Sequence, residues 1–155
     1  MLTDEKGQRS MKILFVDDNW NLLERVIPIL TGAGLDVWGL APNISFKPFR
    51  SRLCTMNGSQ EGDNGTVYGG EEKIPVERMI KLAREADVIF LDHNMFPITG
   101  EDWLAWCREK GILFERKRVI GISSDHQGYL DERFFAGNLY DPDDVKRFLD
   151  TNKGD

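Results

Sequence analysis

The sequence has few cysteines, no long apolar run and no excess of basic residues. Its 155 residues include two cysteines, Cys54 and Cys107, and neither belongs to a Cys-x-x-Cys pair. Two such thiols are too few for a disulfide framework, and they fit a reducing cytoplasm. No apolar stretch is long enough to cross a bilayer, and residues 1–10 lack the apolar segment of a signal peptide. We therefore expect a cytoplasmic protein without a membrane partner.

Acidic residues outnumber basic ones. The chain has 26 Asp and Glu against 20 Lys and Arg, which gives a formal net charge of −6. A general nucleic-acid-binding protein needs a basic face, so nucleic acid is not an expected partner. The length and the 41% of hydrophobic residues fit one globular domain. We expect this domain over residues 11–155, preceded by a disordered tail at 1–10.

Short apolar runs alternate with amphipathic helical patterns from residue 11 onward. Continuous apolar strands separated by helices predict a doubly wound parallel α/β sheet, with helices on both of its faces. A fourth helix would have to be short, because residues 125–135 leave little room for it. The predicted strands are 12–17, 35–40, 87–92, 117–123 and one near 133–140, and the predicted helices are 21–34, 74–86, 101–111 and 141–154.

Acidic and hydroxyl residues occupy the ends of three of these strands. Asp17 and Asp18 lie at the end of the first strand, Asp92 at the end of the third, and Ser123 at the end of the fourth. In a doubly wound sheet, sites form at the carboxyl ends of the strands, where the strand order reverses. Carboxylates that meet there repel one another, and a hard divalent cation such as Mg²⁺ removes the conflict. The pattern therefore predicts a magnesium site.

This arrangement has a matching chemistry. A carboxylate can act as a nucleophile and form an aspartyl-phosphate, while a nearby hydroxyl binds the phosphoryl oxygens. On this interpretation Asp92 is the phosphoacceptor, Asp17 and Asp18 hold the metal, and Ser123 contacts the phosphoryl group.

Three segments resemble the receiver domains of two-component response regulators. They are "ILFVDDN" (13–19), "VIFLDHNMFPITG" (88–100) and "RVIGISS" (118–124). The resemblance implies a flavodoxin-like sheet with strand order 2-1-3-4-5 and five helices. It also implies phosphotransfer from a histidine kinase or a phosphotransfer protein, and output by contact with a downstream protein target. The metal ligands would then include Asp92 and the backbone carbonyl of Asn94.

Two regions depart from the family pattern. The family places a lysine before a proline at the end of the fifth strand, whereas Asp141 precedes Pro142 here and is expected to cap the last helix. The aromatic residue that usually precedes this lysine corresponds to Asn138. An insertion at 42–73 follows the second strand, and connections of this length are usually functional or disordered. Within it, residues 57–70 read as a flexible loop.

The insertion leaves the sheet at the same edge as the acids. We expect it over or beside the acidic pocket, where Lys47, Arg50 or Arg52 would supply positive charge; a solvated loop without a role is the alternative.

Several functions stay open. One is a phosphate-accepting receiver, and another is a degenerate receiver that acts as a phosphorylation-independent docking module. "VIFLDHN" also resembles the first motif of haloacid-dehalogenase-type phosphatases, although these need Asp-x-Asp and the second acid is Asn94 here. His93 and His126 are candidates to join the acids in a transition-metal site, or else are polar loop residues. Beyond phosphoacceptance, including self-phosphorylation from small donors, we expect no enzyme activity.

Overall fold

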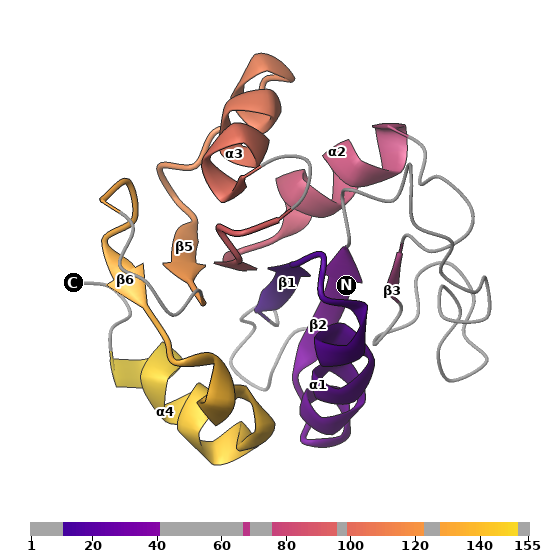
Figure 1. Cartoon of the computed structure of the whole chain (residues 1–155), viewed down its shortest axis with the longest axis vertical. Coiled ribbons are helices and arrows are strands. Elements are labelled where there is room, and N and C mark those ends of the chain that lie inside the picture. Colours follow the sequence, from indigo (N-terminus) through magenta and orange to yellow (C-terminus); the bar gives the residue numbers. More distant parts are fainter. Residues whose placement is uncertain (1–10, 41–66, 69–75, 96–98, 123–127, 152–155) are drawn as a thin grey trace, which may run out of the picture.

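The computed structural model describes residues 11–40, 67–68, 76–95, 99–122 and 128–151 (Figure 1). They form a six-stranded sheet with the order β3-β2-β1-β4-β5-β6, and all five neighbouring pairs are parallel. The strands are β1 (Lys12–Val16), β2 (Asp36–Leu40), β3 (Val67–Tyr68), β4 (Val88–Leu91), β5 (Arg118–Gly121) and β6 (Glu132–Arg133). The helices are α1 (Trp20–Gly32), α2 (Val76–Glu85), α3 (Gly100–Glu109), the 3-10 helix η3 (Ala136–Tyr140) and α4 (Pro142–Thr151).

The helices cover the sheet on both faces. Figure 1 shows α1 and α4 on one face and α2 and α3 on the other. This arrangement confirms the predicted doubly wound, flavodoxin-like fold. When β3 is left out, the remaining strands lie in the order β2-β1-β4-β5-β6, which is 2-1-3-4-5 when these five are numbered along the chain. No helix in the described part of the chain is long and apolar enough to span a membrane.

The two ends of the sheet hold features that the sequence pattern does not predict. β3 adds a strand beside β2, and it lies inside the segment 57–70 that reads as a flexible loop. The placement of the fifth strand near 133–140 is wrong for most of that range. The strand is β6, which pairs with β5 over only two residues, and η3 follows it. In η3 a single side chain, that of Leu139, is buried, so the segment lacks the continuous apolar run of a central strand.

β1 and β4 form the centre of the sheet because their side chains are apolar on both faces. Ile13 to Val16 and Val88 to Leu91 are all buried. The rings of Phe15 and Phe90 stack with their centroids 4.7 Å apart and tie the two strands together. Burial on both faces is what a parallel sheet covered by helices requires. The result is a rigid base directly beneath the acidic residues that follow each strand.

Polar side chains begin three of the helices. Asn19 caps α1 and accepts a hydrogen bond from the backbone N–H of Leu22. Thr99 and Asp102 form a capping box at the start of α3. The Asp141 carboxylate accepts from backbone N–H groups in the first turn of α4, as expected for a cap. Each cap satisfies N–H groups that have no partner within the helix.

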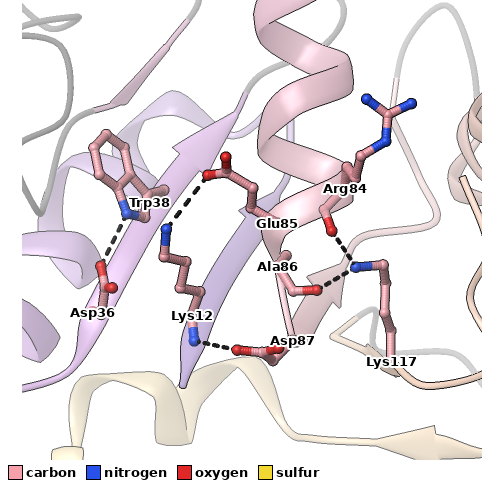
Figure 2. Close-up of polar contacts among 8 residues, drawn as sticks. All are labelled: Lys12, Asp36, Trp38, Arg84, Glu85, Ala86, Asp87 and Lys117. Carbon is pink, nitrogen blue, oxygen red and sulfur yellow. Dashed lines mark hydrogen bonds and ion pairs between the residues drawn. The ribbon is translucent and has the colours of Figure 1, made fainter. Parts of the chain in front are cut away.

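Polar contacts connect the amino-terminal ends of the strands with one another and with the end of α2 (Figure 2). The backbone N–H of Lys12 donates to Asp87 at 2.9 Å, which joins β1 to the residue just before β4. The Lys117 ammonium donates to the carbonyls of Arg84 and Ala86, each at 2.6 Å. A cation at the carboxyl end of a helix satisfies its last carbonyls and complements its dipole. The contacts fix the edge of the sheet opposite to the acidic residues.

Candidate functional site

The acidic residues meet at the carboxyl edge because β1 and β4 are neighbours in register. Val16 pairs with Leu91, so Asp17 and Asp92 each follow a paired position. The ladder continues past both strand ends. The N–H of Asp92 donates to the Val16 carbonyl at 2.9 Å, and the N–H of Asp17 donates to the Leu40 carbonyl at 3.0 Å. The main chain at Asp92 is therefore hydrogen-bonded to β1, and the main chain at Asp17 is hydrogen-bonded to β2.

The structure brings Asp17, Asp18 and Asp92 into one cluster. One carboxylate oxygen from each residue lies within 4.8 Å of the others. Asp17 is only 3% exposed, and the other two are half-buried. His93 lies next to Asp92 in the sequence, but it is not part of this cluster of possible ligands.

Burial and like charge raise the pKa of Asp17 from its ordinary value to about 8. Loss of solvent is the largest cause, and the negative charge of Asp92 is the next. The backbone N–H of Asn19 donates to Asp17 at 2.8 Å and acts in the opposite direction. A side-chain hydrogen bond with Asp92 and the charge of Asp18 raise the pKa further. At neutral pH the cluster therefore retains a proton.

The donor set fits a hard divalent cation. Three carboxylates within this distance supply the oxygen ligands that Mg²⁺ prefers, and the ion would keep several waters. Burial and the charges of Asp92 and Asp18 both disfavour the ionised form of Asp17 and raise its pKa. A cation would relieve the same repulsion.

The backbone that follows β4 is fixed around His93. Its carbonyl accepts two hydrogen bonds, from the N–H of Met95 at 2.9 Å and from the N–H of Gly100 at 3.0 Å. Its ring nitrogen Nδ1 lies 2.8 Å from the hydroxyl of Tyr129. These three bonds hold the chain immediately after Asp92.

The lack of a side chain at Gly100 allows the Asp92 backbone and the Tyr129 hydroxyl to lie close to the start of α3. A Cβ atom at this position would lie 2.6 Å from the backbone oxygen of Asp92 and 2.8 Å from the Tyr129 hydroxyl. Both separations are shorter than a carbon–oxygen contact permits, so a glycine is required here. Gly100, the first residue of α3, thus packs against both the backbone of Asp92 and the hydroxyl of Tyr129.

Tyr129 is a site residue that sequence reasoning missed. It lies 36 residues from His93, and no local spacing connects the two. Burial raises the pKa of Tyr129 to about 12, and the charges of Glu101 and Asp92 add to this effect. The phenol therefore stays protonated and can donate a hydrogen bond.

Of the remaining predicted site residues, the structure describes Asn94 and Asp141. Ser123, His126 and the basic residues of the insertion fall outside the described residues, and Asn94 is exposed. Asp141 lies after η3 rather than at the end of β6, and its carboxylate accepts from the N–H groups of Asp143 at 3.0 Å and Asp144 at 3.4 Å. The Asp141 carboxylate thus serves as a helix cap, and this residue brings no positive charge to the carboxyl edge of the sheet.

No protein-family model and no curated protein matches the sequence. Two solved structures that resemble the chain are receiver domains. One is the BeF3-activated DrrB receiver domain, with 17% identity and a TM-score of 0.47, covering 92% of this chain and 99% of that one. The other is a CheY-like response regulator receiver domain protein from Methanospirillum hungatei JF-1, with 12% identity and a TM-score of 0.47, covering 92% of this chain and 96% of that one.

Proposed function

We propose that the chain is a receiver-like signalling domain of a two-component phosphorelay, which accepts a phosphoryl group at Asp92 with the help of Mg²⁺. The observation that carries this proposal is the cluster of Asp17, Asp18 and Asp92 at the carboxyl edge of a parallel sheet, with carboxylate oxygens within 4.8 Å of one another. A structural sheet has no need of three acids at one edge, because they repel.

In the proposed reaction the Asp92 carboxylate is the nucleophile. One of its oxygens forms a bond to phosphorus as the P–N bond to the donor histidine breaks, and the donor imidazole keeps the electron pair and takes up a proton. Bound Mg²⁺ would neutralise charge on the transferring group. Asp17, Asp18 and the backbone carbonyl of Asn94 are its proposed ligands together with Asp92. The Ser123 hydroxyl is proposed to donate a hydrogen bond to the phosphoryl oxygens.

The partners follow from this chemistry. A histidine kinase or a phosphotransfer protein would supply the phosphoryl group, and output would pass through contact with a downstream protein. We place residues 11–155 in one domain and the protein in the cytoplasm, and we expect no catalytic turnover beyond phosphoacceptance. Because Asp141 caps α4 and brings no positive charge to the site, phosphorylation should be slow.

That same observation favours a second function, a docking module that works without phosphorylation. A phosphoryl group would lack the charge-assisted hydrogen bond that a lysine provides. The fold and the acidic cluster would then serve as a binding surface only.

Incubation with Mg²⁺ and acetyl phosphate, followed by intact-mass measurement, separates these functions. A single phosphoryl adduct that is absent in Asp92→Asn supports the phosphoacceptor. No adduct at high donor concentration supports the docking module. Continuous release of phosphate from an aryl phosphate ester would instead indicate a phosphatase, and Asp92→Asn should then abolish that release.

A further inference from the structure

We propose that Tyr129 is a positioning residue for the acidic cluster. Through His93 it fixes the backbone that carries Asp92, and it thereby links metal occupancy of the cluster to the segment 128–131 that leads into β6. This inference rests on the proposed function, since it requires that the cluster binds a divalent cation.

The first support is the bond between the two side chains. The Tyr129 hydroxyl lies 2.8 Å from Nδ1 of His93, and the ring centroids are 5.5 Å apart. The bond joins one hydroxyl group and one ring nitrogen, and which of the two donates follows the tautomer of His93. Both residues are half-buried, so water competes less with the bond than it would at the surface.

The second support is the number of ways in which His93 is held. Its carbonyl accepts from the N–H groups of Met95 and Gly100, and its ring is bound by Tyr129. Asp92 directly precedes it, and the N–H of Asp92 is tied to Val16 in β1. A shift of the Asp92 main chain is therefore resisted by a neighbouring residue whose backbone and side chain are both hydrogen-bonded.

The third support is the close fit at Gly100. The Tyr129 hydroxyl and the backbone oxygen of Asp92 both lie within 2.8 Å of the position that a Cβ would take there. The two groups thus contact the same point at the start of α3. Tightly packed interiors pass on a displacement instead of absorbing it. A change in the Asp92 backbone will therefore be felt at Tyr129.

Such a link is reciprocal. If metal binding stabilises the hydrogen bond between Tyr129 and His93 by some factor, that hydrogen bond stabilises the metal-bound form by the same factor. Loss of the bond must then weaken metal binding to that extent. A single hydrogen bond of this kind predicts an effect of about two- to tenfold on the dissociation constant.

The test compares Tyr129→Phe with Tyr140→Phe. The two variants lose the same atom, and Tyr140 is 42% exposed in η3 and is not one of the cluster residues. We expect the Mg²⁺ or Mn²⁺ dissociation constant, measured by calorimetry or Mn²⁺ electron paramagnetic resonance, to rise about two- to tenfold in Tyr129→Phe. It should be unchanged in Tyr140→Phe. His93→Phe should have the same effect as Tyr129→Phe, and the double variant should show no further loss.

Hydrogen exchange in the unmodified protein gives a test without a variant. Adding Mg²⁺ should slow exchange at amides 128–131, and Tyr129→Phe should lose that response. An unchanged dissociation constant in Tyr129→Phe, together with a lower melting temperature in EDTA, would show a merely structural bond and overturn the inference. Unaltered exchange at 128–131 in metal-bound wild type would also overturn it. If the wild type binds no metal at all, the metal site of the proposed function fails first, and the inference fails with it.

Discussion

Asp17 and Asp92 have carboxylate oxygens within 4.8 Å of each other, and a hydrogen bond joins their side chains. Two carboxylates can share a hydrogen bond only while one of them keeps a proton. The raised pKa of Asp17, about 8, agrees with this, because burial and the Asp92 charge both favour the neutral acid. Without a cation, the proton is what allows the two acids to stay together.

Replacing the buried acid should stabilise the metal-free protein. The folded-state pKa of Asp17 lies above its ordinary value of 3.8, so the folded state loses stability as the pH rises from about 4 through 8. Asp17→Asn removes this loss. We expect a higher melting temperature than wild type in EDTA at pH 8, by about 2–4 °C for each kcal/mol gained. The two proteins should converge at pH 4, and a constant difference between them at every pH would contradict the assignment.

Metal binding should strengthen with pH. The Asp17 proton must leave before the carboxylate can ligate a cation, so affinity rises as the pH approaches 8. Release of one proton per metal predicts up to about a tenfold change per pH unit below that value. Calorimetry of Mg²⁺ binding between pH 6 and 9 measures it. Affinity independent of pH across this interval would show that Asp17 does not bind the metal.

Gly100→Ala should disturb the site and the fold together. The added methyl group would press on the backbone oxygen of Asp92 and on the Tyr129 hydroxyl. Overpacking of this kind costs about 1–3 kcal/mol of unfolding free energy, which urea denaturation can measure. Gly32→Ala is the matched control, because no atom lies within 4 Å of its Cβ position at the end of α1. That change should be neutral or stabilising. Equal effects of the two substitutions would contradict the close fit at Gly100.

Asp141→Lys should fail to restore fast phosphorylation. The Asp141 side chain is bound to the first turn of α4, beyond η3, so a lysine there would not begin from the end of β6. Loss of the cap should cost about 0.5–2 kcal/mol, whereas Asp141→Asn should keep most of it. Intact-mass time courses with acetyl phosphate and thermal melts provide the two measurements. Rapid adduct formation in Asp141→Lys would show that the missing lysine is the cause of slow acceptance.

The central part of the fold follows from local patterns in the sequence. β1 and β4 are continuous apolar runs that end in acids, and parallel pairing alone brings Asp17 and Asp92 to one edge. The Asp141 cap is likewise a local signal, since a capping residue precedes a proline at the start of a helix. These elements depend on neighbouring residues and on one rule of sheet geometry, and for that reason sequence reasoning finds them.

The remaining features depend on contacts that no local pattern encodes. β3 and β6 have two residues each, which is too short for an apolar period to appear. The bond between His93 and Tyr129 joins residues far apart in the chain, and neither residue type is specific for it. The close packing at Gly100 shows only as a glycine at the start of a helix. Such features are decided by the tertiary fold.

The central position of β1 also has a consequence for the order in which the protein can be made. β1 leaves the ribosome before the other described strands of this sheet, yet one of its two neighbours, β4, begins at Val88. The contact between Lys12 and Asp87 spans 75 residues. A nascent chain must therefore be synthesised past Phe90 before the stacked rings of Phe15 and Phe90 can meet. During that interval an apolar strand is exposed, which is the condition under which chaperones bind and unfinished chains associate.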